Sequence, residues 1–397
     1  MKEDNMKQGW EIKKLGEVCE VIGGSTPKTN EPTYWDGDYF WVTPAELDGT
    51  KLISSTKRTI TEAGVKSAHL QLLPAGTVLL SSRAPIGKVA ITTVPMYCNQ
   101  GFKNLICSDK LYNCYAYWFL YANTEYLNAL GTGATFKEIS KKVVEQIPIP
   151  VPPLPVQEQI VSELDLLSGI IEKKREQLKE LDALAQSIFY DMFGDPITNE
   201  KGWEVKKLGE VCEVTSFKRV LIEEVVETGI PFIRGTELTA LSKLPNSKDY
   251  PFTLFITKEH YERVKAISGV PTIGDLLIPS INSEGLIWEL DTDEPRYYKD
   301  GRVLWVHTNH KYNYSKALKY ILSNKLRMMY NELASGATFI ELKLFVLRDI
   351  ELPFPPLPLQ HQFASKIEAI ERQKELIKQS ITETETLFNE RMQHYFG

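Results

Sequence analysis

Two long stretches of the chain carry apolar residues at alternating steps of three and four positions. The first series is Ile160, Leu164, Leu167, Ile171, Leu178, Leu181, Ala185, Ile188 and Met192. The second series is Phe363, Ile367, Ile370, Ile377, Ile381, Phe388 and Tyr395, interrupted by Lys374 and Thr384. This heptad pattern predicts two amphipathic helices of about 35 residues, or about 50 Å, each. Because the apolar stripes are narrow, we expect the helices to pack on each other as an antiparallel coiled coil, rather than each on its own domain.

One lysine, Lys174, interrupts the first apolar series. A polar residue at a seam position of a coiled coil can set the register of the two helices at a cost in stability. The hypothesis is that Lys174 does so, and that Lys174→Leu stabilises the helix pair.

Outside these stretches the pattern changes to short apolar runs and turns. Residues 77–80 and 88–91 are predicted strands separated by a loop, and residues 115–130 and 316–333 are predicted helices. Prolines before each heptad stretch predict extended, non-helical connectors. These prolines are Pro148, Pro150, Pro152, Pro153 and Pro155 in the first connector, and Pro353, Pro355, Pro356 and Pro358 in the second.

The chain repeats itself in patches. Residues 9–21 (GWEIKKLGEVCEV) return as 202–214 with one change, and the G-A-T-F of 133–136 returns at 336–339. The first connector, IPIPVPPLPVQEQ at 147–159, returns as IELPFPPLPLQHQ at 350–362, while GTVLLSSRAPIG at 76–87 is only weakly matched by GDLLIPSINSEG at 274–285. Since a recent duplication would leave similarity spread evenly, near-identical ends around divergent middles indicate constant parts with one role and variable parts with another.

These observations predict an α+β chain. Two tandem α/β modules, residues 1–156 and 198–357, are each followed by a long helix, residues 157–197 and 358–397. An antiparallel helix pair would place the modules at opposite ends, related by a pseudo-twofold axis.

Composition narrows the class of protein. The 397 residues include 25% charged and 10% aromatic side chains, which is typical of folded domains and not of a disordered chain. The five cysteines form no C-x-x-C pair, the first ten residues lack a signal-peptide core, and no segment is long and apolar enough to cross a membrane. We therefore expect a cytoplasmic protein with reduced thiols and no membrane partner.

No motif in the sequence predicts catalysis. Residues 23–29 (GGSTPKT) lack the spacing of a phosphate-binding loop, and the pair His307 and His310 has no further metal ligands nearby. Motifs of hydrolases, zinc proteases and dinucleotide-binding folds are absent, as is the Asn/Asp-Pro-Pro-aromatic segment of an amino-methyltransferase. The sequence therefore predicts a non-catalytic chain without a bound metal or cofactor.

The remaining candidates for chemistry are polar and basic residues of the variable middles. Arg and Asn side chains can read guanine and adenine edges, whereas Lys and Thr commonly hold phosphates, so these residues form a candidate DNA-binding set. In the first module they are Lys28, Thr29, Ser81, Ser82, Arg83, Lys88, Lys103, Thr135 and Lys137. In the second they are Lys218, Arg219, Arg234, Asn282, Ser283, Asn309, Lys311 and Thr338.

Together, these features resemble the specificity subunit of a type I restriction–modification system. The resemblance rests on two variable modules, each with a P-x-P-P-L-P-x-Q-x-Q connector and a heptad helix, on both G-A-T-F segments, on the module openings at 10–16 and 203–209, and on GTVLLSSRAPIG. It implies that each module is a target recognition domain reading one half of a bipartite, asymmetric target in double-stranded DNA. It also implies that the coiled coil sets the spacer.

The resemblance has implications for partners as well. Two identical methyltransferase subunits would dock on the constant parts and bring S-adenosylmethionine, and restriction (motor–nuclease) subunits would bring ATP and Mg²⁺. The recognition domains of such subunits vary too much for base-reading roles to be transferred to this chain.

Two alternatives from other classes remain. The same architecture would suit a scaffold with two ligand-binding heads, which salt-dependent binding to duplex DNA distinguishes. A self-sufficient methyltransferase or nuclease is disfavoured by the absent motifs. The net charge of −6 does not exclude DNA, since residues 157–197 carry 4 basic and 9 acidic residues, whereas residues 1–156 carry 16 and 15. It predicts that the chain alone binds DNA weakly.

Overall fold

The fold is described from a computed structural model of the chain. It covers residues 9–83, 85–133, 137–221, 224–244, 247, 250–282, 284–299, 301–308, 311, 313–333 and 341–397. The chain divides into two compact units: unit 1 comprises Met1–Arg175 and Ser380–Gly397, and unit 2 comprises Glu176–Gln379. The boundaries that we predicted fall at the starts of the long helices, whereas the compact units divide the helices themselves. Each unit therefore contains one module and part of both helices.

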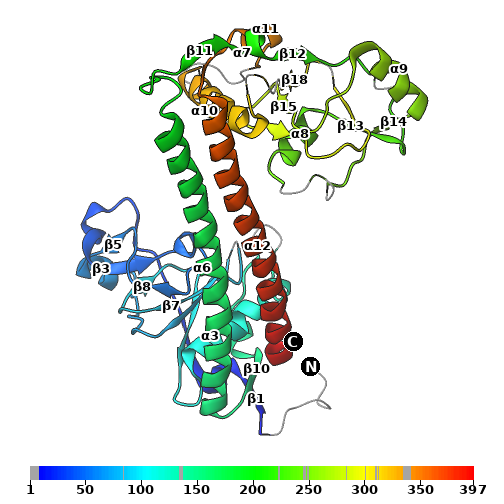
Figure 1. Cartoon of the computed structure of the whole chain (residues 1–397). Helices are drawn as coiled ribbons and strands as arrows, with labels where there is room; N and C mark the ends of the chain where they lie inside the picture. Colours follow the sequence, from blue (N-terminus) through cyan, green and yellow to red (C-terminus); the bar gives the residue numbers. More distant parts are fainter. Residues whose placement is uncertain are drawn as a thin grey trace. The chain divides into compact units, whose positions relative to one another are not determined.

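A mixed five-stranded sheet forms the centre of unit 1 (Figure 1). Its strands, in spatial order, are β2 (Cys19–Gly23), β9 (Lys103–Cys107), β6 (Val78–Leu80), β7 (Val89–Thr92) and β4 (Leu52–Ile53). The two strands predicted at 77–80 and 88–91 are β6 and β7, which pair antiparallel as expected. Side chains of β6 and β7 are buried on both faces, since α3 (Asn113–Ala122) covers one face and Leu79 and Ala90 face a second small core.

A smaller three-stranded sheet extends unit 1. It consists of β5 (Thr59–Ile60), β3 (Trp35–Val42) and β8 (Tyr97–Cys98), with β3 antiparallel to β5 and parallel to β8. Its core holds Trp35, Trp41, Ile60 and Tyr97. The short helices of the unit are α1 (Leu15–Val18), α2 (Glu62–Ser67), α4 (Thr124–Ala129) and α5 (Lys141–Glu145), with 3₁₀ turns at Pro32–Tyr34 and Pro44–Glu46.

Unit 2 repeats this topology with different residues. The counterpart of the larger sheet has the order β12 (Glu213–Ser216), β18 (Val303–His307), β15 (Leu276–Pro279) and β16 (Trp288–Glu289). The smaller sheet consists of β14 (Phe255–Ile256), β13 (Ile230–Ile233) and β17 (Tyr297–Tyr298), again with one antiparallel and one parallel pair. The helices of its module are α7 (Leu208–Val211), α8 (Gly235–Leu241), α9 (Lys258–Ser268), α10 (Ser315–Leu333) and α11 (Leu344–Asp349). The weak match between residues 76–87 and 274–285 thus marks the equivalent strands β6 and β15.

The near-identical ends of each repeat form one substructure. In unit 1, β1 (Glu11–Lys14) pairs antiparallel with β10 (Pro148–Val151), and in unit 2 β11 (Glu204–Lys207) pairs in the same way with β19 (Glu351–Phe354). The proline-rich connectors are therefore extended, as predicted, and lie in two-stranded ribbons that tolerate proline. We call each ribbon with the adjoining four-residue helix, α1 or α7, a basal ribbon.

A buried glutamine explains why the connector is repeated. The side chain of Gln157 accepts a hydrogen bond from the backbone N–H of Tyr112 at 2.8 Å and donates to the carbonyl of Pro152 at 2.8 Å. Gln360 makes the same two bonds, from the N–H of Tyr314 at 2.9 Å and to the carbonyl of Pro355 at 2.8 Å. Both side chains are almost completely buried. Each glutamine therefore joins the start of a long helix to the loop that precedes α3 or α10.

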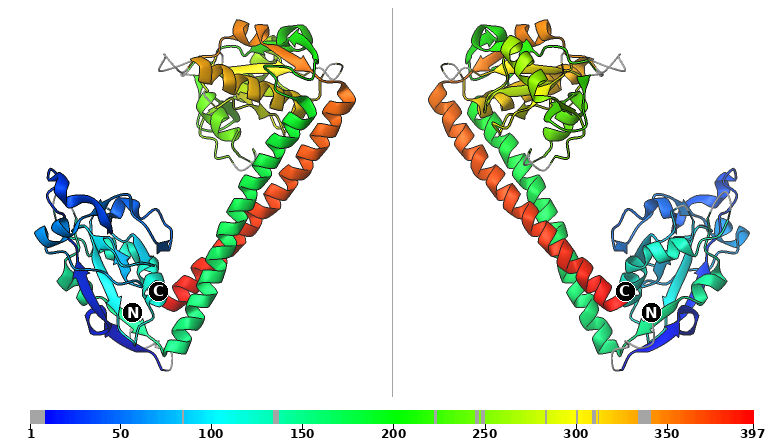
Figure 2. Two further views of the ribbon diagram at one scale, coloured as in Figure 1. Left: turned by 90° about the vertical axis from the view of Figure 1, so that its left-hand side faces the viewer. Right: turned by 90° about the vertical axis from the view of Figure 1, so that its right-hand side faces the viewer.

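The two long helices are α6 (Leu154–Phe193) and α12 (Leu357–Phe396), and they run side by side in Figures 1 and 2. In unit 1, Glu163 of α6 meets Arg391 of α12 at 2.9 Å, and Arg175 meets Glu385 at 2.6 Å. In unit 2, Phe193 lies 4.6 Å from Phe363 between ring centroids. As the residue number rises along α6, the number of its contact partner on α12 falls, so the predicted antiparallel packing is confirmed. We call α6 and α12 the helix pair.

The helices begin earlier than predicted. Each is 40 residues long rather than about 35, because Pro155 and Pro358 lie in the first helical turn instead of in the connector. Proline is tolerated there, since a first-turn N–H has no partner inside the helix. The helix predicted at 115–130 also differs, because it breaks at Asn123 into α3 and α4. The amide of Asn123 donates to the carbonyl of Phe119 at 2.8 Å and so competes with the helical hydrogen bonds.

Most of the predicted seam is buried. The residues below about a tenth exposed are Ile160, Leu164, Leu167, Ile171, Phe363, Ile367, Ile370 and Ile381. Leu178, Leu181, Ile188, Ile377 and Phe388 are half-buried. At the end of α6 the seam moves by one position, since Phe189 and Phe193 are buried while the predicted Ile188 and Met192 are only half-buried. The reason is that Phe189 and Phe193 join the core of the second module as well as facing Phe363.

Candidate nucleic-acid interface

The loop after β2 presents the first two predicted contact residues, Lys28 and Thr29, both of them exposed. The loop is held to β8, because the N–H of Ser25 donates to the carbonyl of Cys98 at 3.1 Å. Gly24 makes this approach possible, since a Cβ at this position would lie 2.0 Å from the carbonyl oxygen of Asn99.

Two tryptophans of β3 hold the same loop through hydrogen bonds. The indole N–H of Trp35 donates to the carbonyl of Lys28 at 3.1 Å, and that of Trp41 donates to the carbonyl of Ser25 at 3.2 Å. Their rings lie edge to face, 5.0 Å apart. The loop that displays Lys28 and Thr29 therefore rests on a rigid aromatic platform.

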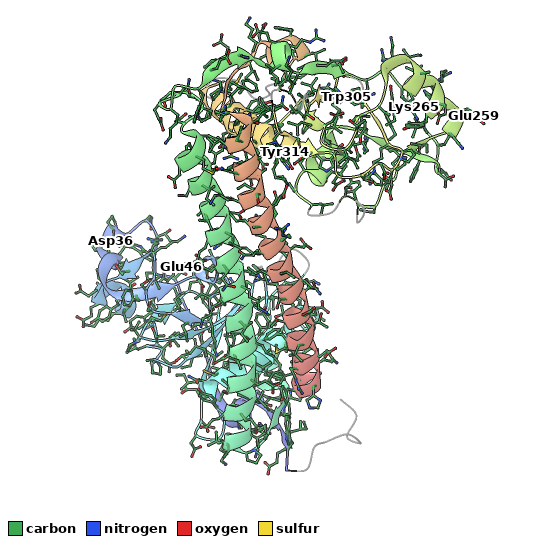
Figure 3. The ribbon with its side chains drawn as sticks, in the orientation of Figure 1. Asp36, Glu46, Glu259, Lys265, Trp305 and Tyr314 are labelled. Carbon is green, nitrogen blue, oxygen red and sulfur yellow. The ribbon has the colours of Figure 1, made fainter. Side chains whose placement is uncertain are left out.

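Arg58, which the sequence analysis did not select, lies on this platform. Its guanidinium carbon is 3.6 Å from the centroid of the Trp35 ring, and the residue is exposed. The neighbouring backbone is fixed by Glu46, labelled in Figure 3, whose carboxylate accepts from the N–H of Thr43 at 2.8 Å and from the N–H of Lys57 at 2.7 Å. The contact with Trp35 joins residues distant in sequence, so no local motif could have identified it.

A second group of predicted residues gathers around a carboxylate. Glu138 forms ion pairs with Arg83 at 2.9 Å and with Lys103 at 3.1 Å. Burial alone would raise the pKa of Glu138, but hydrogen bonds from Arg83 and Lys103 outweigh it and leave the pKa below its ordinary value. Lys137, next in sequence, is exposed. Two of the predicted cations are therefore already neutralised within the module, and Lys137 is exposed beside them.

The serines of this region are structural rather than available for contact. Ser81 and Ser82 are completely buried, and Ser81 donates to the carbonyl of Pro85 at 2.8 Å. Ser82 accepts from the ammonium group of Lys103 at 3.3 Å. Ser82, which we predicted to contact DNA, is inaccessible in the structure, because its hydroxyl organises the loop. Lys88 is half-buried, and its ammonium group lies 3.4 Å from the carbonyl of Pro44.

The corresponding loop of unit 2 follows β12 and carries the exposed residues Lys218 and Arg219. It is tied down by Tyr297, whose hydroxyl accepts from the N–H of Lys218 at 3.0 Å. Phe217, one residue earlier, stacks on Trp305 with the rings 5.6 Å apart and nearly parallel. Trp305 is labelled in Figure 3. Both units therefore hold this basic loop on aromatic side chains, although the residues differ.

Arg234 occupies the place in unit 2 that Thr43 has in unit 1. Thr43 directly follows β3, and Arg234 directly follows β13, the central strand of the small sheet in each unit. Each caps the start of a helical segment, and the glutamate three residues later accepts a hydrogen bond from its backbone N–H. Arg234 pairs with Glu237 at 2.5 Å. Burial would raise the pKa of Glu237, but the hydrogen bonds from Arg234 lower it overall. The predicted residue Arg234 is thus exposed and held in one orientation.

Asn282, another predicted contact residue, is also largely buried. Its side chain is only 7% exposed and accepts from the backbone N–H groups of Glu284 and Leu286, each at 3.0 Å. It therefore shapes its own loop and does not present its amide to a ligand.

A carboxylate equivalent to Glu138 lies in this region of unit 2. Glu341 pairs with Arg302 at 3.2 Å and with Lys343. Hydrogen bonding to Lys343 is the main reason that the pKa of Glu341 is lowered. The N–H of Leu342 donates to the carbonyl of Ser280, as that of Ile139 does to Ser82. Glu138 and Glu341 each lie two residues after a G-A-T-F segment, so extending that repeat by two residues would have found both.

The remaining predicted contact residues are either exposed or outside the described part of the chain. Lys311 is exposed, whereas Thr135, Ser283, Asn309 and Thr338 lie outside the described residues. His307 meets the buried carboxylate of Asp275 at 2.9 Å, while His310 also lies outside them. Among the residues that the structure describes, no group of three or more His, Cys, Asp or Glu side chains is arranged to hold a metal ion. No helix in the described part of the chain has the length and apolar content of a membrane span.

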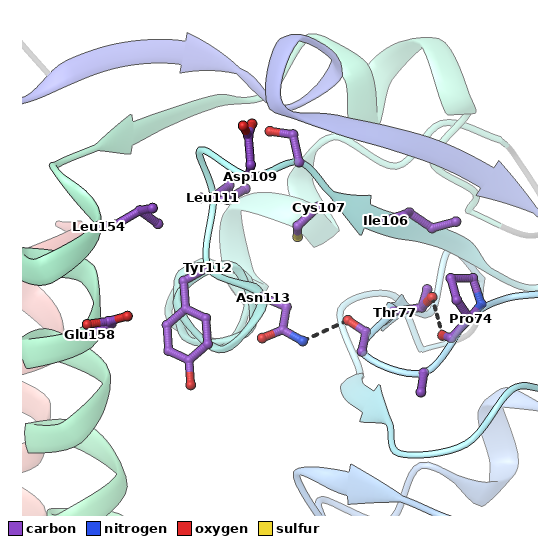
Figure 4. Close-up of a pocket in the computed structure, with 13 residues that line it drawn as sticks. Pro74, Thr77, Ile106, Cys107, Asp109, Leu111, Tyr112, Asn113, Leu154 and Glu158 are labelled. Carbon is purple, nitrogen blue, oxygen red and sulfur yellow. Dashed lines mark hydrogen bonds between the residues drawn. The ribbon is translucent and has the colours of Figure 1, made fainter.

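A cavity of about 360 Å³ lies in unit 1 between the start of α3 and the first turns of α6 (Figure 4). Asn113 donates to the carbonyl of Gly76 at 2.8 Å, and the hydroxyl of Thr77 donates to the carbonyl of Pro74 at 2.7 Å. None of the predicted contact residues lines this cavity. The candidate interface is therefore the set of exposed loops, not a pocket.

Comparisons with known proteins agree with this arrangement. The sequence matches the family described as Type I restriction modification DNA specificity domain twice, over residues 7–182 and 200–386. The MjaIX specificity subunit of a type I restriction enzyme from Methanocaldococcus jannaschii is 36% identical over 278 residues, which cover 63% of this chain and 64% of that protein. The MjaVIII specificity subunit of the same organism is 24% identical over 400 residues, covering 93% of this chain and 90% of that protein.

The fold agrees as well. The crystal structure of a type I restriction–modification S subunit from M. genitalium superposes with a TM-score of 0.59 at 14% sequence identity, covering 100% of this chain and 98% of that one. At this identity the likeness concerns the fold.

Proposed function

The chain belongs to the family of type I restriction–modification DNA specificity domains, and on that premise we propose that it is the DNA-recognition subunit of a type I complex. The chain itself is non-catalytic. Each module reads one half of a bipartite, asymmetric target in double-stranded DNA, and the catalytic steps belong to partner subunits.

The observation that carries this proposal is that each unit combines a basal ribbon similar in both repeats with sheets and loops whose sequences differ between the repeats. The four strands shared by the larger sheets, and the three of the smaller sheets, have the same order in both modules, but the loops that display basic residues differ. In unit 1, Trp35 binds the backbone carbonyl of Lys28 and stacks against the guanidinium group of Arg58. In unit 2, Tyr297 holds the backbone of Lys218 and Glu237 pairs with Arg234. One scaffold with two different contact surfaces suits two different half-sites.

The two basal ribbons support a partner that is present twice. Their first strands and short helices are nearly identical in sequence (EIKKLGEV and EVKKLGEV), and both ribbons make the same backbone hydrogen bond, Leu15 N–H to Ile147 carbonyl and Leu208 N–H to Ile350 carbonyl, each 2.9 Å. Leu184 and Leu387 occupy equivalent repeat positions and expose 46% and 41% of their surface. Such matched surfaces, with the same residues exposed at equivalent positions of both repeats, suit two identical methyltransferase subunits.

The helix pair is the proposed spacer. Each helix has 40 residues, hence a length of about 60 Å at about 1.5 Å per residue. Major-groove faces one turn of DNA apart are separated by about 34 Å, so a helix of this length is long enough to set the separation of two half-sites. We infer that shortening both helices by a heptad would shorten the spacer and leave both half-sites unchanged.

Cofactors are assigned to the partners. The methyltransferase subunits would bind S-adenosylmethionine, and restriction subunits would bind ATP and Mg²⁺. The complex would work in the cytoplasm, where its DNA substrate is found. Because Glu138, Glu237 and Glu341 neutralise nearby cations, the isolated chain should bind DNA weakly, and its affinity should fall further with salt.

The test is to co-express the chain with candidate methyltransferase subunits, purify the complex and map methylated sites in the host genome. The proposal predicts stable co-purification and methylation at one bipartite, asymmetric sequence that is lost when this chain is omitted. Methylation by the chain alone, or a complex that binds no specific duplex, would contradict it. A pure scaffold would also give no steep salt dependence of DNA binding.

A further inference from the structure

We propose that Arg58 reads a guanine in the half-site of the first module, with its guanidinium group pre-oriented by the ring of Trp35. This inference rests on the proposed function and specifies one base-reading residue within it. Three properties of Arg58 lead to it: the stacking contact, the fixed backbone and, among the residues that the structure describes, the absence of a carboxylate partner.

The stacking contact immobilises the side chain without using its donors. The guanidinium carbon lies 3.6 Å from the Trp35 ring centroid and 5.9 Å from that of Trp41. A ring below a guanidinium group occupies one face of the plane, while the N–H donors lie in the plane and point outward. Trp35 itself cannot turn freely, since its indole N–H is bonded to the carbonyl of Lys28.

The backbone of Arg58 is equally well fixed. Its carbonyl accepts from the N–H of Trp41 at 3.3 Å and from the hydroxyl of Thr56 at 2.7 Å. The preceding N–H, that of Lys57, is held by Glu46 at 2.7 Å. Holding both backbone and side chain lowers the conformational entropy that binding would otherwise remove.

The ionic contacts of Arg58 differ from those of three other arginines in the described part of the chain. Arg83, Arg234 and Arg302 each pair with a glutamate. In the part of the chain that the structure describes, Arg58 makes no ion pair with a carboxylate and is exposed. A planar group with two free parallel donors matches the O6 and N7 acceptors of guanine in the major groove, which a lysine cannot match in the same bidentate way.

The neighbouring residues have the chemistry of phosphate contacts. Lys28 and Thr29 are exposed on the loop that Trp35 holds, and Lys57 is exposed beside Arg58. Lysines commonly bind phosphates as point charges, whereas the stacked guanidinium group presents its donors in a fixed plane. The surface around Trp35 therefore combines residues that would position DNA with one, Arg58, that would discriminate a base.

The experiment uses the complex of this chain with its methyltransferase subunits and a duplex carrying the mapped target. Each guanine is replaced in turn by 7-deazaguanine, which lacks the N7 acceptor, and dissociation constants are measured for wild type, Arg58→Gln, Arg58→Lys and Lys57→Gln. We expect Arg58→Gln to weaken target binding by about 5- to 150-fold. One guanine, in one half-site only, should become insensitive to the deaza replacement.

The other two variants separate base reading from charge. Arg58→Lys keeps the charge and should keep the salt dependence while losing the same guanine preference. Lys57→Gln, the matched control, should weaken all sequences by one common factor and lower the salt slope by about 0.9.

The proposal is overturned if Arg58→Gln leaves affinity unchanged, or weakens target and unrelated sequences equally with every deaza effect retained. If the wild-type complex itself shows no specific target, the proposed function fails and not the assignment of Arg58. Unchanged circular dichroism and co-purification of the variants exclude loss of folding as the cause.

Discussion

Replacing Lys174 tests how the helix pair keeps its register. The ammonium group of Lys174 donates to the hydroxyl of Ser380 at 2.6 Å, to the hydroxyl of Thr384 at 3.0 Å and to the carbonyl of Ser380 at 3.2 Å. All three acceptors belong to α12 within unit 1. From the sequence, Lys174→Leu is expected to stabilise the pair, but these bonds reverse the expected sign for the single replacement.

The size of the effect follows from which atoms lose their partners. The hydroxyl of Thr384 also donates to the Ser380 carbonyl at 2.7 Å, so both groups keep a hydrogen bond without Lys174. The Ser380 hydroxyl is the group left unpaired, and because Ser380 is half-buried the cost lies near the lower end of the about 1–3 kcal/mol of a buried group. Added apolar burial by leucine offsets part of this. We expect Lys174→Leu to lower the local free energy of opening by about 1 kcal/mol, a net of these opposing terms.

A second replacement should change the sign. In Lys174→Leu/Ser380→Ala the unpaired hydroxyl is gone, and apolar replacement of a polar network is often neutral or stabilising by about 1–4 kcal/mol. We expect the double variant to be about 1 kcal/mol more stable locally than the wild type.

The assay is amide hydrogen exchange of residues 168–180 and 376–388 in the full chain, because it measures local opening directly. Since about 1.4 kcal/mol corresponds to a tenfold change, exchange should be about fivefold faster in the single variant and about fivefold slower in the double variant. Lys173→Leu, at an exposed neighbouring position, is the control and should change little. Slower exchange in Lys174→Leu alone would refute the reasoning, since it would mean that apolar burial outweighs the hydrogen bonds.

Three further predictions follow from the fold and the site. Gln157→Leu should lower the free energy of unfolding of the first module by about 2–4 kcal/mol, because three backbone groups, those of Tyr112, Pro152 and Lys110, lose their partner. Gln360→Leu should act alike in the second module, and a denaturant titration that shows no loss of stability for either variant would contradict this role. Because the pKa of Glu138 is lowered in the folded chain, its ion pairs stabilise the loop above the ordinary carboxylate pKa. That contribution should disappear as the pH falls through the lowered value, so Glu138→Gln should flatten the acid limb of the pH–stability curve, and an unaltered limb would count against it. Leu184→Ser/Leu387→Ser should reduce co-purification of methyltransferase subunits about tenfold or more while leaving the melting temperature unchanged, whereas undiminished assembly would exclude these leucines from the interface.

The helices and the repeat could be predicted from the sequence because their signals are local. The spacing of Ile160, Leu164 and Leu167 is sufficient to define an amphipathic stripe, and the proline run is sufficient to define an extended connector. The end of the seam was less predictable. Phe189 and Phe193 are buried because the core of the second module packs there, and the heptad spacing carries no information about that core.

The contact residues were harder to predict for a related reason. Ser82 and Asn282 have side chains that suit DNA contacts, yet both are buried because their own loops need their hydrogen-bonding groups. Arg58 was missed because its significance depends on Trp35, which reaches it only through the pairing of β3 with β5. Burial and stacking across strands are properties of the tertiary structure, so residue type alone does not identify the interface.

The most direct test of the account is to replace the second module, residues 198–357, by a second copy of the first, residues 1–156, and to map methylation by the assembled complex. If each module reads one half-site, the asymmetric target should become an inverted repeat of the half-site read by the first module. An assembled chimera that still methylates the original asymmetric target, or one unrelated to that half-site, would contradict the account.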